Sequence, residues 1–390
     1  MKSGFWGVTA GTAVILLAAL STGSPVLLAL FFLLLCMALY ALISAVWAAR
    51  TLRLVGELDE HTVRRGEDVR LTLQVRHRGL LPIAPVRLEL SAGPGLEGTE
   101  VLLRNRPGKL QTLVMPFRAD HVGPWAPGVR AWTVEDLFGL FSIRREVSDD
   151  PFRILVLPNT FDTEPLTLSP GDPGTEALAR ATEDLSSPSD IREYQPGDPL
   201  KKIHWKLSLR KQELLVRKYD EPILQEVLIL MDCSRPPSWG HPEAEADLRD
   251  ALLETAASVF RDQVNTDLQV HFPLFGSHPV ELEKGMGLPL AMENLARTDF
   301  SDPDRFEQVL MLESRRLRKV GCLVVISARL NSALVDVMTR MRHMGPSLRL
   351  YLVTFTPEDS RLMPLISRLQ QSGIEVSYVR PEAHAVQPEL

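Results

Sequence analysis

The chain has 390 residues, which is too long for one ordinary domain and predicts two or three folded units. Its 43 basic and 49 acidic residues give a formal charge of −6, and this balance excludes a protein committed as a whole to nucleic acid. The three cysteines are far apart in the sequence, so they predict neither a disulfide framework nor a CxxC metal site. This cysteine usage fits a reducing compartment.

The first 50 residues contain two runs without a charged side chain, Phe5–Leu20 and Val26–Ala49. About 20 apolar residues in a helix cross the roughly 30 Å hydrocarbon core of a bilayer, because a helix satisfies its own backbone hydrogen bonds there. The runs predict a transmembrane helical hairpin over residues 1–54, in a protein of the cell membrane. The alternative for the first run is a secretory signal with Lys2 as its charged region, but an uncharged turn leads from that run directly into the second span.

The positive charges flank this hairpin and are absent from its turn. Lys2 precedes the first run, and the second run is followed by Arg50, Arg53, Arg64 and Arg65. Because basic residues favour the cytoplasmic side of a membrane, both the N- and the C-terminus are predicted to be cytoplasmic. Neither run contains a charged residue that would indicate an ion path, so we interpret the hairpin as an anchor.

Residues 55–147 predict an all-β, sandwich-like domain. Apolar residues alternate with polar ones at Val69, Leu71, Leu73 and Val75, which is typical of a half-buried strand. Further short runs are separated by turns that contain Gly and Pro, and this spacing favours a β-sandwich. The segment has no cluster of His, Cys or paired carboxylates, so we interpret it as packing or docking structure.

Residues 223–390 predict a doubly wound α/β domain. The run Val227–Met231 is continuously apolar, as in a parallel strand covered on both faces. In such sheets ligands usually bind at loops that follow the carboxyl ends of strands. Further strands are expected near residues 268–272, 322–327, 349–355 and 374–379, and helices near residues 243–264, 303–318 and 332–344.

The loop after the first strand of this domain carries Asp232, followed two residues later by Ser234. This resembles the start of the DxSxS metal site of von Willebrand A domains, in which oxygen ligands hold Mg²⁺. Pro236 stands in place of the second Ser, and Ser327 stands where the distal Asp is expected. The resemblance implies a von Willebrand A-like fold with a degenerate Mg²⁺ site. The alternative is that Asp232 and Ser234 cap the following segment.

Residues 148–222 combine a linker with a basic connector. From Lys201 to Lys218 seven Lys or Arg residues stand against one acid, Glu213. Apolar and polar residues alternate from Ile203 to Arg210, which favours a strand with one cationic face, although a short helix is also compatible.

Three interpretations compete for this connector. It is a solvated face in which Arg192 and Asp198 pair locally to hold a turn, or a docking surface for an acidic protein partner, or a site for anionic lipid or nucleic acid. Trp205 and Tyr194 beside several cations are residue types that dominate protein interfaces.

The connector resembles the domain of unknown function 58 family, whose hallmark is an R-x-Y-x-x-GD turn followed by a basic residue, an I-x-W pair and a Ser. The matching positions are Arg192, Tyr194, Gly197, Asp198, Lys202, Ile203, Trp205 and Ser208. Upstream, residues 135–141 read EDLFGLF and resemble the family's DPFGLF element. Lys201 and Lys202 stand where Arg is more usual in the family, which weakens any role that needs bidentate guanidinium contacts.

The resemblance implies a membrane partner of a cytoplasmic MoxR-type AAA+ ATPase, acting as an adaptor in protein maturation or envelope assembly. Nucleic acid is not expected as a partner, whereas anionic lipid is an alternative for the connector. The candidate partner-binding residues are Arg192, Tyr194, Gly197, Asp198, Lys201, Lys202, Trp205, Lys206 and Ser208.

We expect no enzymatic activity, because the sequence carries no GxxxxGK[ST], HExxH, GxSxG or GxGxxG motif. Asp198, His204 and Ser208 have the residue types of a catalytic triad, but no oxyanion-hole signature accompanies them. The rival hypothesis is a cryptic Mg²⁺-dependent or hydrolytic enzyme centred on Asp232 and Ser234.

Overall fold

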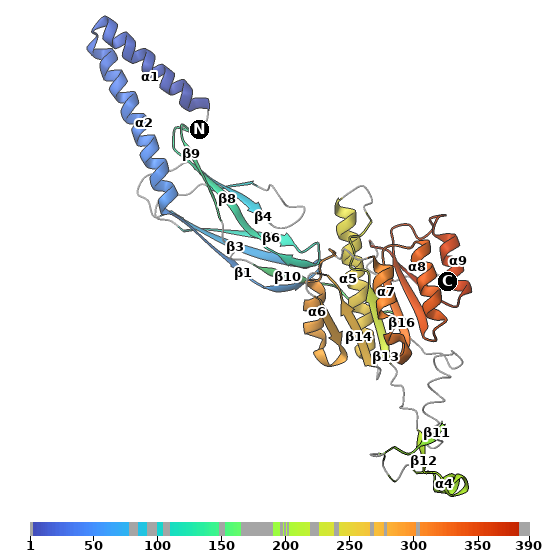
Figure 1. The fold of residues 1–390 in the computed structure, drawn as a ribbon. Coiled ribbons are helices and arrows are strands. Elements are labelled where there is room, and N and C mark those ends of the chain that lie inside the picture. The colour runs from blue at the N-terminus through green and yellow to red at the C-terminus, as the bar shows by residue number, and fades with distance from the viewer. Residues whose placement is uncertain are drawn as a thin grey trace. The chain divides into compact units, whose positions relative to one another are not determined.

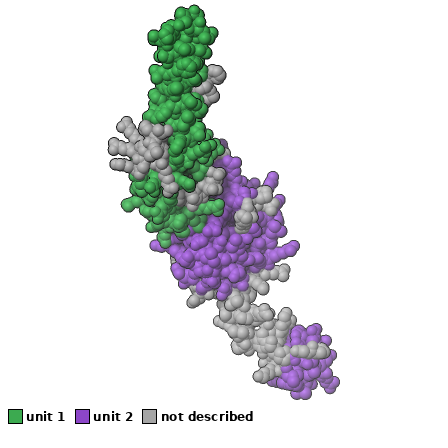
Figure 2. Space-filling view, turned by 90° about the vertical axis from the view of Figure 1, so that its left-hand side faces the viewer, with its two compact units in different colours: residues 1–156 green, residues 157–390 purple. Residues whose placement is uncertain are grey.

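The computed structural model describes fourteen stretches of the chain, which Figure 1 draws as coloured ribbon. The chain forms two compact units, residues 1–156 and 157–390, shown in green and purple in Figure 2, and each is described by itself. The described residues are 3–77, 85–91, 100–103, 110–147, 153–164, 190–195, 198, 200, 203–218, 226–237, 242–265, 269–276, 279–301 and 305–381.

The first unit begins with two helices, α1 (Ser3–Thr22) and α2 (Pro25–Thr51). Gly23 joins them with a φ of +64°, a left-handed conformation that glycine adopts without a steric penalty. Of the described helices, α2 is the one both long and apolar enough to cross a membrane, and α1 offers a shorter apolar stretch, Gly7–Thr22. The chain therefore has a candidate membrane-spanning helix near its N-terminus, which is compatible with membrane anchoring.

The last turns of α2 are protein-covered on one face. They pack against strands β8 (Gly128–Glu135) and β9 (Ser142–Glu146) of the same unit. Small side chains make this close packing possible, and the buried ones are Ala41, Ser44, Ala45, Ala48 and Ala49.

After the two helices, the described residues of the first unit form three small sheets. Val69, Leu71, Leu73 and Val75 of β3 are buried while the residues between them are less so, as the alternation predicted. They belong to one apolar core that also receives the end of α2. The sheets are β1 (Leu52–Leu58)–β3 (Asp68–His77)–β6 (Leu110–Arg118), β5 (Glu100–Leu103)–β4 (Val86–Ser91)–β8–β9, and β2 (Thr62–Arg64)–β10 (Ile154–Leu157)–β7 (Gly123–Trp125). Strand β10 lies beyond residue 147, where the sequence pattern ended this domain.

The second unit contains an open six-stranded sheet of order β15-β14-β13-β16-β17-β18. All neighbouring strands are parallel except β14 and β15. The chain runs outward from β13 in one direction and from β16 in the other, so the point where the strand order reverses lies between these two strands. The strands are β13 (Glu226–Met231), β14 (Gln269–Leu274), β15 (Val280–Glu283), β16 (Val320–Ser327), β17 (Ser347–Val353) and β18 (Glu375–Val379).

Helices cover both faces of this sheet. One face packs against α5 (Pro242–Val264), which contacts α6 (Leu288–Ala296). The other face shares an apolar core with α7 (Phe306–Glu313), α8 (Ser332–Arg342) and α9 (Met363–Gln371). The described residues of this unit also include two short 3-10 helices, η2 (Lys284–Met286) and η3 (Arg316–Lys319). The sequence pattern did not predict α6, α9 or β15.

Residues 190–218, which we call the basic module, form a third group of elements. Strands β11 (Asp190–Glu193) and β12 (Leu215–Lys218) pair antiparallel, and α4 (Trp205–Lys211) lies between them in sequence. The strand favoured for residues 203–210 is wrong beyond Ile203, which makes an isolated bridge to Val216. The segment turns helical because the His204 ring caps the helix start and the left-handed Gln212 ends it.

We expect Ala45→Leu to loosen the packing of α2 on β8 and β9, because overfilling a close-packed contact typically costs about 1–3 kcal/mol. Hydrogen exchange of the β8 and β9 amides, measured on the full chain in lipid, should become faster. Leu42→Ala is the matched control, since Leu42 is on the exposed face of the same helix. Unchanged exchange in Ala45→Leu would contradict this packing.

Candidate functional sites

Ser208 fixes helix α4 onto strand β12 of the basic module. Its hydroxyl donates to the carbonyl of His204 (3.0 Å) and accepts from the backbone N–H of Leu215 (2.9 Å). The His204 ring Nδ1 in turn accepts from the N–H of Leu207 (3.2 Å). Ser208 is buried, so the structure places this candidate partner-binding residue inside the module, where it holds the helix in position.

Arg192 of β11 and Asp198, which precedes α4 in the sequence, form a two-pronged ion pair. Arg192 Nη1 lies 2.8 Å from Asp198 Oδ2, and Nη2 lies 2.7 Å from Oδ1. The hydrogen bonds with Asp198 raise the pKa of the Arg192 guanidinium above its ordinary value. The Asp198 carboxylate also accepts from the N–H of Gln195 (3.0 Å). The Tyr194 N–H donates to the backbone carbonyl of Leu214 (2.8 Å). The local pairing that the sequence offered as one interpretation is therefore present.

The outer surface of α4 combines large apolar side chains with cations. Trp205 and Leu209, one helical turn apart, are 57% and 78% exposed, and Leu200 is 66% exposed. The cations Lys206, Arg210 and Lys211 are exposed as well. We call Leu200, Trp205, Lys206, Leu209, Arg210 and Lys211 the α4 patch. The candidates Gly197, Lys201 and Lys202 lie outside the described residues.

Asp232 occupies the switch point of the six-stranded sheet, at the carboxyl end of β13. It is 4% exposed. Its Oδ1 accepts from both the N–H (3.1 Å) and the hydroxyl of Ser234, and its Oδ2 accepts from the hydroxyl of Ser327 (2.9 Å) at the end of β16. The structure thus brings together the three residues that the sequence compared with metal ligands.

A cation already contacts this group of oxygens. The Arg329 guanidinium donates to the Ser234 hydroxyl and to the carbonyl of Arg235 (2.6 Å), and its Nε lies 3.8 Å from Asp232 Oδ2. A buried carboxylate needs a compensating charge, and Arg329 supplies it. A divalent cation at the same oxygens would meet a fixed positive charge, so these residues do not fit a Mg²⁺ site.

A pocket of about 560 Å³ opens beside Asp232, against the first turns of α7 and α8. Asn331 caps α8 by accepting from the N–H of Leu334 (2.7 Å), and its amide donates to Glu307 (2.7 Å). Arg235, also in the lining, pairs with Glu245, and this hydrogen bond lowers the pKa of the Glu245 carboxyl. The pocket is therefore lined largely by side chains that already have partners within the described part of the chain.

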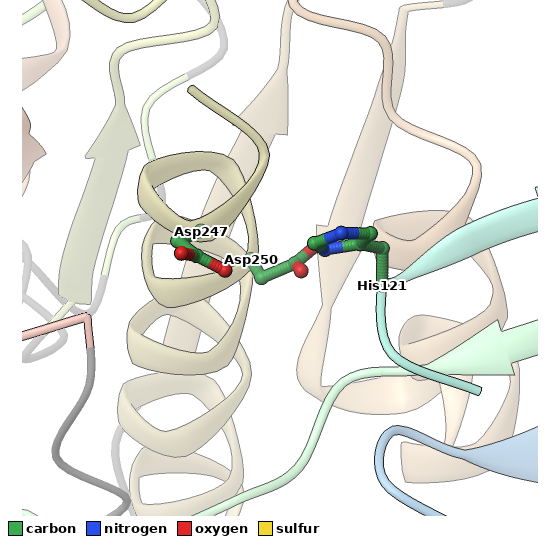
Figure 3. Close-up of side chains that lie close together, drawn as sticks. All are labelled: His121, Asp247 and Asp250. Carbon is green, nitrogen blue, oxygen red and sulfur yellow. The ribbon is translucent and has the colours of Figure 1, made fainter. Parts of the chain in front are cut away.

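Two acidic or histidine groupings were missed by the sequence reasoning. The first grouping contains Asp247 and Asp250, which lie one turn apart on α5 (Figure 3). Two acids on one helix do not by themselves define a site. His121, which Figure 3 also draws, belongs to the first unit. On the antiparallel pair β14–β15, His271 Nδ1 lies 3.2 Å from Glu281, which also binds Arg316 (2.7 Å). This second grouping is an ion-pair network at the sheet edge. The signal for it in the sequence is the alternation of apolar and acidic residues along β15.

Comparison with known proteins identifies one family. Residues 190–345, which include the basic module and the Asp232 loop, match the model described as "Protein of unknown function DUF58". This confirms the family that the motif from Arg192 to Ser208 predicted. A search among curated proteins finds no match.

Similar solved structures add no argument, because their TM-scores are far below 0.5. Spo0M, a sporulation control protein from Bacillus subtilis, is 16% identical to this chain with a TM-score of 0.16. The match covers 37% of this chain and 58% of Spo0M, so this chain spans little more than half of the length of Spo0M. Cwp6 from Clostridium difficile is 10% identical, with 84% and 53% covered and a TM-score of 0.21. An exo-β-N-acetylglucosaminidase from Vibrio harveyi is 9% identical, with 84% and 81% covered and a TM-score of 0.20.

We expect Ser208→Ala to destabilise the basic module by about 1–3 kcal/mol, because the buried N–H of Leu215 loses its acceptor. Exchange of the Leu215 amide should become faster, which hydrogen exchange with mass spectrometry can measure. Ser314→Ala is the control, since the exposed Ser314 hydroxyl binds only a carbonyl of its own helix. Equal protection of Leu215 in the variant and the wild type would show that Ser208 does not hold α4.

Proposed function

We propose that this chain, which belongs to the DUF58 family over residues 190–345, is a membrane-anchored, non-catalytic adaptor whose basic module docks a protein partner. The observation that carries the proposal is the exposure of Trp205 and Leu209 on α4, beside Lys206 and Arg210. Large apolar side chains grouped in water usually mark an interaction surface, and Trp and Arg are the residue types that contribute most to binding.

The module is prepared for binding before a partner arrives. Ser208 and the His204 cap hold α4 against β12, so the helix does not have to order itself when it docks. Preorganisation of this kind lowers the entropic cost of association. The α4 patch can therefore bind as a rigid helix surface.

The charges on the module favour an acidic partner. Arg192 is already neutralised by Asp198, whereas no ion pair holds Lys206, Arg210 or Lys211 among the described residues. Cations at the rim of an apolar patch steer association and select a partner of opposite charge. The positive charge available for binding therefore lies on α4.

The family resemblance suggests the identity of the docking partner. It implies a cytoplasmic MoxR-type AAA+ ATPase, or the client of such an ATPase, in protein maturation or envelope assembly. For such a partner to reach the module, α1 and α2 would both cross the membrane and leave the N- and C-termini cytoplasmic, as the basic residues that flank them favour. The second unit would then be a von Willebrand A-like domain used for binding.

Two alternatives lead to different observations. A metal-dependent or hydrolytic enzyme at Asp232 and Ser234 is disfavoured by the Arg329 guanidinium, which contacts the same oxygens. Binding of anionic lipid by the basic module would appear as salt-sensitive attachment to anionic vesicles, because surface electrostatics are screened by salt. The exposed Trp205 and Leu209 favour a protein partner over a purely electrostatic one.

We expect Trp205→Ala to abolish crosslinking of an AAA+ ATPase to the full-length protein in its native membrane. Truncating a central aromatic residue of an interface commonly costs about 2 kcal/mol or more, which is roughly a thirtyfold loss of affinity. Mass spectrometry of the captured proteins gives the readout. Leu312→Ala is the matched control, because Leu312 is 68% exposed on α7, outside the α4 patch.

A second variant separates charge from apolar contact. Lys206→Glu should also lose the partner and should leave the fold intact, since Lys206 is exposed. Arg361→Glu serves as its control, because Arg361 is an exposed cation outside the α4 patch. Capture of the same ATPase by wild type, Trp205→Ala and Lys206→Glu alike would refute docking through the module. If the wild type captures no protein, the adaptor hypothesis fails and lipid binding gains weight.

Calorimetric titration of the wild-type chain with Mg²⁺ or Mn²⁺ should give no heat of binding, because Arg329 already compensates Asp232. Arg329→Gln should permit weak binding, since Asp232, Ser234 and Ser327 then converge without a positive charge among them. Asp232→Ala is the control. Heat in the wild type that disappears in Asp232→Ala would support the rival metal-dependent enzyme.

A further inference from the structure

We infer that the turn between β8 and β9, residues 136–141, is a second membrane contact that inserts Leu137 and Phe138 into the lipid interface beside α2. The inference rests on the proposed anchoring of the chain by α2 and adds a lipid-binding surface to it. This turn is the EDLFGLF element, to which the proposed docking assigns no role.

The turn is built to keep two apolar side chains outside. Asp136 is buried, and its carboxylate accepts from the N–H of Phe138 (2.8 Å) and from the N–H of Phe141 (2.6 Å). Gly139 completes the turn with a φ of +68°, a left-handed conformation that residues with a side chain rarely adopt. Leu137 and Phe138 are left 48% and 49% exposed. Asp136 therefore satisfies the backbone of the turn, and the two apolar side chains remain about half exposed.

The turn lies against the apolar helix within the first unit. The Phe138 ring centroid is 6.4 Å from that of Tyr40 on α2, with the rings at 71°. Ala41 and Ala45, which follow Tyr40, are buried where α2 packs on β8 and β9. Figure 1 shows the β8–β9 hairpin reaching along α2 in the same way.

The position of Tyr40 along α2 sets the depth of the turn. Tyr40 follows the helix start at Pro25 by about 15 residues, or about 22 Å at 1.5 Å per residue. The hydrocarbon core is about 30 Å thick, so an upright α2 that enters it at Pro25 is still inside it at Tyr40. On this estimate Tyr40 lies about 8 Å inside the boundary of the hydrocarbon. Phe138, whose ring centroid is 6.4 Å from that of Tyr40, then lies near this boundary and not in water. Exposed apolar side chains at this depth are covered by lipid.

Cations gather where α2 leaves the membrane. Arg53 of β1 lies directly opposite Arg76 of β3, and both are exposed. Like charges directly opposite each other destabilise a sheet unless an anion lies between them. Arg50, in the last turn of α2, adds a third charge, and no acidic side chain pairs with any of the three in the described part of the chain. Anionic lipid headgroups at the membrane surface fit this arrangement.

Spin labels on the full-length chain in vesicles that contain anionic lipid test the insertion. The free cysteines Cys36, Cys233 and Cys322 are replaced by Ala, and one new cysteine is introduced for each label. Phe138→Cys and Leu137→Cys report the turn. Leu39→Cys, exposed on α2, reports the lipid interior, and Val114→Cys, exposed on β6, reports water. Each label is probed by collisions with oxygen, which concentrates in lipid, and with a nickel chelate, which stays in water.

The expected result is that labels at residues 137 and 138 favour oxygen over nickel, as the label at residue 39 does, while the label at residue 114 shows the reverse order. Labels at both turn positions that resemble residue 114, with residue 39 still in lipid, would overturn the inference and leave the anchor intact. Labels at the turn that are reached by neither reagent would assign the turn to a protein neighbour and also overturn it. A water-exposed label at residue 39 would refute anchoring by α2 itself.

Discussion

The packing of the alanine-rich end of α2 on β8 and β9 is the contact on which the arrangement of the first unit depends. Ala45 and Ala48 bring the helix close enough for its last turns to enter the core of the β-domain. Because β1 begins at Leu52, directly after α2, the sheet and the helix have no flexible linker between them. A domain joined to an apolar helix in this way keeps a fixed depth and orientation relative to whatever surrounds that helix.

Ion pairs at both candidate sites neutralise the acids that chemistry would use. Asp232 is compensated by Arg329 and bound by Ser234 and Ser327, and Asp198 is held by Arg192. A carboxylate engaged in this way is a poor metal ligand or general base, because its lone pairs and its charge are already satisfied. The α4 patch still presents exposed apolar side chains, together with cations that no ion pair holds among the described residues. This is why we propose binding, and not catalysis, for the residues of the α4 patch.

The sequence predicted the elements whose pattern of apolar residues is local. It did not predict features that depend on contacts between different segments of the chain. Buried Leu71 and Leu73 and the continuous run of β13 follow from period-two alternation and from burial on both faces. The α4 segment also alternates, yet it is a helix that the His204 ring caps and that the hydroxyl of Ser208 holds onto β12. The short helices α6 and α9 carry Pro in their first turn, a usable start signal. The Arg329–Asp232 pair joins residues far apart in sequence, so spacing alone could not reveal it.

The two sequence motifs of this chain use their polar residues in the same structural way. Asp136 satisfies the turn between β8 and β9, and Asp198, His204 and Ser208 satisfy the turn and helix of the basic module. The side chains left outside include large apolar ones, Leu137 and Phe138 at the turn and Trp205 and Leu209 on α4. Exposing a large apolar side chain forgoes roughly 1.5–3 kcal/mol of burial, so neither surface is explained by the stability of the isolated chain. Each is explained if something covers it: we propose lipid as the cover for the turn beside α2, and an acidic protein as the cover for the α4 patch with its cations.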